Sequence, residues 1–352
     1  MSANDAAAVA PLAAGTTDIR SVRTLRYALG STLAMAVAMG FDWQLSFLTP
    51  VLVLSFLGSP APRPAIKNLV TFELVVAVAC AVGLAVGLLL VPFPVVYLLV
   101  LGLLLFHLFY AHTKGAPALI ITWMLIALLL IPILASLSSA LAIAIAGYII
   151  FGSAVALVIV WLAHIAMPDP PQATTKVSTA AAEKTRSAER EIYRALMSTA
   201  VVFPVAALFF AFQSASSLVI LVFIALLTLQ PSLAAGYKAG LALIVGNLAG
   251  GIASMIFYDL LVVAPHFAFM VSLTLLSALL FAAGLFSSSR WAPLFGMAFS
   301  TLLLIIGSTT SSYGEAGDKA STRVIQITLA VIYAVVAHNL ILNLFPRREL
   351  RQ

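Results

Sequence analysis

The sequence is a succession of long apolar stretches separated by short polar breaks, and few folds can accommodate that pattern. A helix needs about 20 mostly apolar residues to cross the roughly 30 Å hydrocarbon core of a bilayer. Hydrophobic residues make up 63% of the chain and charged residues 9%, which is too few charges for a water-exposed surface. We therefore predict an all-α integral membrane protein with about 12 transmembrane helices. The expected spans are 24–41, 43–58, 67–91, 94–111, 117–135, 138–166, 191–211, 214–230, 237–261, 266–286, 291–308 and 322–345.

The two halves of the chain resemble each other. Residues 28–32 correspond to residues 195–199, and Lys67 corresponds to Lys238, so the offset grows slowly along the chain. Such a drift is typical of a tandem duplication with small loop changes, which is a common plan in transporters. A chance match between two Ala/Leu-rich stretches is the alternative.

The positive charges indicate how the spans are oriented. With the N-terminus inside and twelve spans, 16 of the 18 Lys and Arg residues fall on the cytoplasmic side. Only Lys319 and Arg323 fall outside. Six helices per half then place both termini in the cytoplasm and make the two repeats parallel. The expected domains are a tail at 1–20, a first repeat at 21–167, a linker at 168–190, a second repeat at 191–346 and a tail at 347–352.

Several other classes of protein are disfavoured. The net charge of +6 comes from short breaks between apolar runs rather than from a basic stripe, so nucleic-acid binding is not expected. The single cysteine, Cys80, permits no internal disulfide and no Cys-rich metal site. No phosphate-binding loop or His-Glu-x-x-His motif is present, and we expect no enzyme activity, cofactor or metal. Ser153 and His164 are about 16 Å apart along one predicted helix, too far for a catalytic pair.

Ionisable residues within the spans are the strongest candidates for function, because a charge in the membrane is costly unless it is paired or hydrated. Glu73 is the clearest intramembrane carboxylate, about 9 Å below the boundary marked by Lys67. His107 lies at a similar depth in the following span, so we predict a Glu73–His107 pair in proton coupling. A structural hydrogen bond or snorkelling of Glu73 is the alternative. His164 and His338 occupy equivalent places in the sixth and twelfth spans. We expect them to form either a proton or anion site or contacts between helices.

Two further features are candidates for a substrate path and for a partner contact. Asn247 lies between Gly246 and Gly250, where a buried amide serves either a helix contact or a substrate path. We expect the glycines themselves to permit close helix packing, as we do for Gly83 and Gly87. The polar stretch 308–323 has no counterpart in the first half and is expected outside the membrane, as a partner contact or a plain connector. Its charged residues are Glu315, Asp318, Lys319 and Arg323.

Short motifs at equivalent places in both halves resemble the fusaric acid resistance and aromatic acid exporter family. The second half has Leu229-Gln230-Pro231-Ser232, then Lys238 and Gly246-Asn247-Leu248-Ala249-Gly250. The first half has a looser Asp42-Trp43-Gln44, then Leu48-Thr49-Pro50-Val51-Leu52-Val53. Asn247 replaces a threonine that is usual in the family. The chain also lacks the soluble domains of larger members, so it resembles a compact branch.

The resemblance implies a function in transport. Members export small aromatic or carboxylated compounds, often with a periplasmic membrane-fusion adaptor. The expected partners are therefore the lipid bilayer, a small organic anion or aromatic substrate, that adaptor and, as an open alternative, further copies of the chain. A passive organic-anion channel and a membrane scaffold that does not transport remain alternatives to an exporter.

Overall fold

The computed structural model describes most of the chain. The described residues are 19–41, 43, 47–59, 63–168, 188–212, 220–221, 224–225, 228–229 and 233–309, together with 325, 329, 332–333, 336–337 and 340. The expected linker, most of the eighth and twelfth spans and most of the stretch 308–323 lie outside these residues. His338 and the four charged residues of that stretch lie outside them too.

Every regular element in the described part of the chain is a helix, and no strand occurs there. This agrees with the predicted all-α class. The helices are α1 (Ile19–Phe41), α2 (Leu48–Leu57), α3 (Ile66–Leu90), α4 (Pro94–Thr113), α5 (Ala118–Leu137), α6 (Ser139–Ala166), α7 (Ala188–Ala211), α9 (Leu233–Val263), α10 (Phe267–Leu285) and α11 (Ala292–Thr309).

Seven of the described helices are long and apolar enough to cross a bilayer, as expected of a multi-pass membrane protein. They are α3, α4, α5, α6, α7, α9 and α10. In lipid a helix satisfies its own backbone hydrogen bonds, which explains why these apolar segments are helical. The helix α1 carries Arg20, Arg23 and Arg26 in its first turns, so it is less apolar than the seven. The helices α2 and α11 are shorter.

Local signals fix several helix ends close to their predicted positions. Pro94 occupies the start of α4, where its missing N–H costs no hydrogen bond. The turn from α4 to α5 contains Gly115 with φ of +93°, a conformation that favours glycine. Ser138 forms the whole connection between α5 and α6, and its hydroxyl accepts a hydrogen bond from the Leu141 N–H at 3.3 Å. This agrees with the short gap between the expected spans 117–135 and 138–166.

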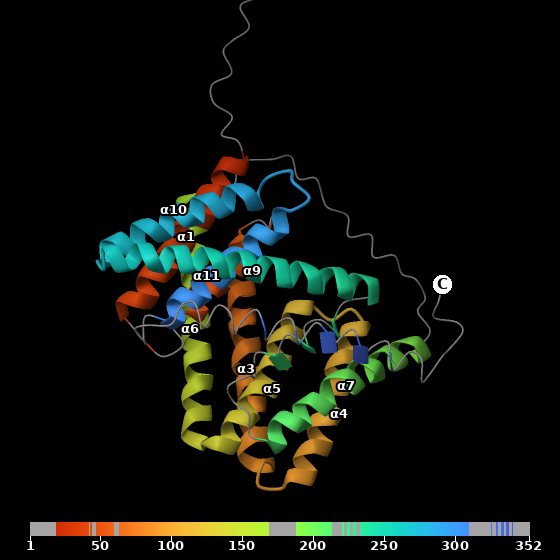
Figure 1. Cartoon of the computed structure of the whole chain (residues 1–352). Coiled ribbons are helices and arrows are strands. Elements are labelled where there is room, and N and C mark those ends of the chain that lie inside the picture. Colours follow the sequence, from red (N-terminus) through yellow and green to blue (C-terminus); the bar gives the residue numbers. More distant parts are fainter. Residues whose placement is uncertain are drawn as a thin grey trace, which may run out of the picture.

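The helices form two interlocked groups (Figure 1). In this view α1, α9, α10 and α11 lie above α3, α4, α5 and α7, and α6 runs from the lower group up behind α1. The main packing pairs are α3 with α5, α9 with α11, α1 with α10 and α4 with α7. Because α1 packs on α10 and α7 packs on α4, each half of the chain contributes a helix to the other half.

Glycines permit the closest of these contacts. A Cβ added at Gly83 of α3 would lie 2.7 Å from the Ala127 carbonyl oxygen of α5. A Cβ at Gly246 of α9 would lie 2.8 Å from Met297 Cβ of α11, and one at Gly250 would collide with the Ala298 carbonyl oxygen. The predicted role of these glycines in close helix packing is therefore confirmed.

Candidate functional site

The intramembrane carboxylate Glu73 is hydrogen-bonded across a helix interface. It lies in the second turn of α3 and is half-buried. The Ser153 hydroxyl of α6 lies 2.9 Å from one Glu73 carboxylate oxygen and 3.1 Å from the other. Ser153 has no exposed surface. The contact therefore joins a polar side chain of α3 to a fully buried one of α6.

The same serine hydroxyl also lies 2.9 Å from the Ile150 carbonyl oxygen one turn earlier in α6. A serine hydroxyl has a single proton to donate, but its oxygen also accepts. It can donate to an ionised Glu73. When Glu73 is protonated, the carboxylic acid can donate to Ser153, which then donates to Ile150. Both protonation states of Glu73 are thus hydrogen-bonded without movement of the helices.

Two residues of the first-half motif lie beside this contact. The Thr49 hydroxyl of α2 is fully buried and donates to the Gly152 carbonyl oxygen at 3.2 Å. The Trp43 ring meets the Phe151 ring edge-on, with centroids 5.3 Å apart. Consecutive residues of α6 therefore contact Trp43, Thr49 and Glu73 in turn. A Cβ at Gly152 would lie 3.1 Å from the Thr49 hydroxyl oxygen, so the α2–α6 contact is tight.

The structure does not bring Glu73 and His107 together. The His107 side chain is exposed on α4, and its Nδ1 lies 2.7 Å from the Leu103 carbonyl oxygen of the same helix. The rotation of α4 turns the His107 side chain outward. Ser153, which sequence reasoning considered only as a nucleophile beside His164, occupies the place expected for His107.

His164 is buried in the last turn of α6. Its Nδ1 lies 2.9 Å from the Val160 carbonyl oxygen, so this nitrogen carries the proton. Arg26 of α1, with 1% of its surface exposed, donates to the Met167 carbonyl oxygen at 3.2 Å. Counting charges assigns Arg26 only to the cytoplasmic side and does not predict its burial between α1 and α6.

Asn247 lies in the contact between α9 and α11. Its Oδ1 accepts a hydrogen bond of 2.7 Å from the Thr301 hydroxyl, and 6% of Asn247 is exposed. The glycines on either side of it make the closest approaches of the two helices. Of the two roles left open for Asn247, the geometry favours the helix contact.

The described residues contain no cluster of three His, Cys, Asp or Glu side chains that could hold a metal ion. The candidates Glu315, Asp318, Lys319, Arg323 and His338 lie outside the described residues.

Comparison with known proteins gives one match. A family model described as "Protein of unknown function (DUF2955)" matches residues 23–163, from the first turns of α1 to near the end of α6. The match includes Glu73, Ser153 and Thr49 and does not name the aromatic acid exporter family. No curated protein and no solved structure matches the chain.

Proposed function

We propose that this protein is a secondary transporter of the bacterial inner membrane that exports small aromatic or carboxylated compounds, with Glu73 as its proton-coupling group. The apolar helices support a place in the membrane, and the motif resemblance supports the substrate class. The observation that carries the proposal is the Ser153 contact, because it satisfies Glu73 in both protonation states. A carboxylate that changes charge inside the membrane needs such a partner.

The coupling step follows from the geometry of the contact. When a proton binds Glu73, the charge on α3 disappears while the hydrogen bond to α6 reverses its direction. A neutral Glu73 costs less to move into an apolar environment than an ionised one. Proton binding therefore lowers the cost of moving α3 relative to α6, and this is the step that we assign to substrate release or reorientation.

The architecture that we propose is twelve spans in two parallel six-helix repeats with both termini cytoplasmic. Equivalent helices make equivalent contacts. The pair α3–α5 corresponds to α9–α11, and α1–α10 corresponds to α7–α4. The contact of α1 with α6 has a counterpart in the second half, where the Tyr333 hydroxyl donates to the Val201 carbonyl oxygen of α7 at 2.9 Å. These pairs support a duplicated chain.

Cation–aromatic contacts support a position at the membrane–water interface for three of the cations. Arg63 lies over the Trp161 ring at 5.3 Å, Lys114 over Tyr110 at 4.5 Å and Arg290 over Trp291 at 4.9 Å. The twelve-span topology places all three cations on the cytoplasmic side. Aromatic rings beside Lys and Arg are typical of the membrane–water interface. A periplasmic membrane-fusion adaptor as partner rests on the family resemblance.

The test is flux through purified full-length protein in liposomes. Efflux of benzoate is measured at a series of pH values and with an imposed proton gradient. We expect the gradient to drive accumulation by the wild type. We also expect Glu73→Gln to fold, to keep its contact with Ser153 and to lose the pH dependence. Asp259→Asn is the matched control, because it removes an exposed carboxylate from α9.

Two results would contradict the proposal. Flux through the wild type that never exceeds equilibrium under a proton gradient would identify a passive channel. A wild-type pH response in Glu73→Gln would leave Glu73 as a structural residue, and His164 or His338 would become the next candidates.

A further inference from the structure

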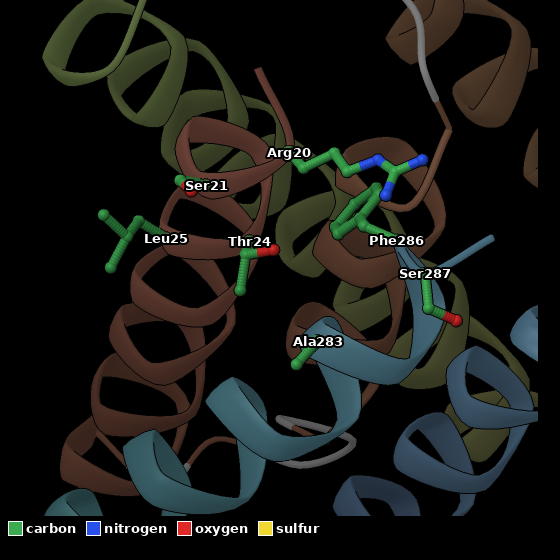
Figure 2. A pocket seen from close by; sticks show the side chains of 7 residues that line it. All are labelled: Arg20, Ser21, Thr24, Leu25, Ala283, Phe286 and Ser287. Carbon is green, nitrogen blue, oxygen red and sulfur yellow. The ribbon is translucent and has the colours of Figure 1, made fainter. Parts of the chain in front are cut away.

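A hollow of about 390 Å³ lies at the surface between the first turns of α1 and the end of α10. Figure 2 shows Arg20 of α1 extending towards Phe286, with Ser287 at the end of α10. Most of the residues that line this hollow are exposed, and none of them has a buried polar atom without a partner. A buried polar atom that does lack a partner lies elsewhere, close to the Glu73 contact.

The indole N–H of Trp43 is buried and has no hydrogen-bond partner within the described part of the chain. A buried tryptophan N–H usually finds a partner, because an unsatisfied buried donor costs free energy. Trp43 precedes α2 and meets the Phe151 ring of α6 edge-on, with centroids 5.3 Å apart. The Trp43 ring is therefore packed against α6 while its N–H has no acceptor.

Gly152 of α6 leaves an atom-sized space beside this donor. A Cβ added at Gly152 would lie 3.1 Å from the Thr49 hydroxyl oxygen and 4.0 Å from the Trp43 indole nitrogen. Among the described residues of other segments, no further heavy atom lies within 4 Å of that point. Gly152 is halfway along the 28-residue helix α6, so the space lies near the middle of a membrane span.

The two polar atoms beside this space offer a ligand different hydrogen bonds. The indole N–H of Trp43 can only donate. The Thr49 hydroxyl already donates to the Gly152 carbonyl oxygen at 3.2 Å, so its own oxygen is left to accept. An atom placed between the two must therefore accept from Trp43 and donate to Thr49. A hydroxyl oxygen does both, whereas a carboxylate oxygen, a ketone oxygen or a halogen has no proton to donate.

We propose that Trp43, Thr49 and Gly152 form a subsite for a hydroxyl group of the transported compound. The hydroxyl oxygen accepts from Trp43 Nε1 and donates to Thr49 Oγ1, and the body of the compound packs against the Phe151 ring, which is 52% exposed. This inference rests on the proposed function and names the chemical group by which the substrate is recognised. A water molecule has the same hydrogen-bonding pattern and is the alternative occupant.

The subsite adjoins the proposed coupling group. Gly152 directly precedes Ser153, whose hydroxyl lies 2.9 Å from a Glu73 carboxylate oxygen. A compound bound at Gly152 therefore lies one residue of α6 away from the contact that reverses its direction when Glu73 is protonated.

The test is binding of two matched benzoates to the purified full-length protein, measured by isothermal titration calorimetry. The compounds 4-hydroxybenzoate and 4-fluorobenzoate share a ring and a carboxylate, but fluorine has no proton to donate. We expect 4-hydroxybenzoate to bind about three- to tenfold more tightly, which is the range expected for one hydrogen bond. Equal affinities would overturn the proposal and indicate a water molecule beside Gly152. Binding of neither compound by the wild type would overturn it as well.

Trp43→Phe keeps an aromatic ring and removes the N–H, so it should weaken 4-hydroxybenzoate binding about three- to tenfold and change 4-fluorobenzoate binding little. Trp161→Phe is the matched control, because Trp161 also has a buried N–H without a partner in the described chain. It should leave both affinities unchanged. Equal losses in the two variants would contradict a site at Trp43.

Gly152→Ala should abolish the preference for the hydroxyl compound, because the new methyl group occupies the space between Thr49 and Trp43. Gly147→Ala on the same helix is its control, since nothing lies within 4 Å of the Cβ position there. Thermal unfolding in detergent shows whether both variants are folded. A folded Gly152→Ala protein that keeps the wild-type preference would place the hydroxyl elsewhere.

Glu73→Gln distinguishes failure of this inference from failure of the proposed function. Binding needs no proton gradient, so Glu73→Gln should keep the preference for 4-hydroxybenzoate while its flux loses the pH dependence. A preference that persists in a protein without proton-driven flux would support the subsite and contradict only the proposed coupling. Proton-driven flux of both benzoates with equal affinities would contradict only the subsite.

Discussion

A single hydroxyl determines how a charge is held within this membrane protein. Ser153 can donate to Glu73 or accept from it, and the Ile150 carbonyl oxygen takes the serine proton in the second case. No second ionisable side chain is needed for the switch. Thr49 fixes the neighbouring Gly152 carbonyl oxygen and thereby holds this turn of α6 against α2. Glu73 therefore has a hydrogen-bond partner, Ser153, that is held in place by its own helix.

We expect Ser153→Ala to change the pH dependence of flux and to reduce its maximum about tenfold. Without the hydroxyl, a half-buried Glu73 loses a hydrogen bond, and an unsatisfied polar group costs about 1–3 kcal/mol. The same substitution in a Glu73→Gln background should leave the pH profile flat. Liposome flux with all four proteins forms a double-mutant cycle. Strictly additive effects of the two substitutions would show that Ser153 does not act through Glu73.

Sequence reasoning identified Glu73 but not its partner, for a physical reason. Depth in the membrane follows from residue counting at 1.5 Å per residue, so the sequence places Glu73 and His107 at one level. Which residues face each other depends on the rotation of each helix, and apolar residues surround every face of α4. The sequence therefore gives no signal that His107 is turned outward. The distance from Ser153 to His164 along α6 excluded a catalytic pair but said nothing about contacts with α3.

At the scale of the elements, glycine contacts hold α3 to α5 and α9 to α11. The predicted and observed helix ends agree closely for α3 and α6, where long apolar runs end at polar or turn residues. The burial of Arg26 in α1 was not predicted, because positive charges near helix ends are used to predict only the orientation of the helices. Its contact with the end of α6 emerges only when the helices are packed.

We expect Gly83→Ala to destabilise the protein by about 1–3 kcal/mol, because the new methyl group would meet the Ala127 backbone at 2.7 Å. Backbone cannot move aside as a flexible side chain can. Gly147→Ala in α6 is the matched control, since nothing lies within 4 Å of the Cβ position there. It should be neutral or stabilising by up to about 1 kcal/mol through helix propensity. Thermal unfolding in detergent measures both, and equal effects would exclude a tight α3–α5 contact.

At the scale of the whole molecule, the exchange of helices between the halves explains why neither half is a separate domain. The first half's α1 packs on α10, and the second half's α7 packs on α4. The proposed repeats say which helices correspond but do not predict this interlocking. Contacts between the two halves depend on three-dimensional packing.

Parallel repeats make a prediction that inverted repeats contradict, because equivalent loops must then face the same side. Lys114 and Arg290 precede α5 and α11 and are exposed, and we expect cysteines at both positions to be labelled from the cytoplasm. Phe93 and His266 lie in the equivalent turns before α4 and α10, and cysteines there should be labelled from the periplasm. The native Cys80 is buried and provides the background of an unlabelled thiol. A membrane-impermeant maleimide applied to intact cells and to inverted vesicles distinguishes the sides. Labelling of Lys114→Cys and Arg290→Cys from opposite sides would show inverted repeats and an odd number of spans between them, and the proposed twelve-span topology would be wrong.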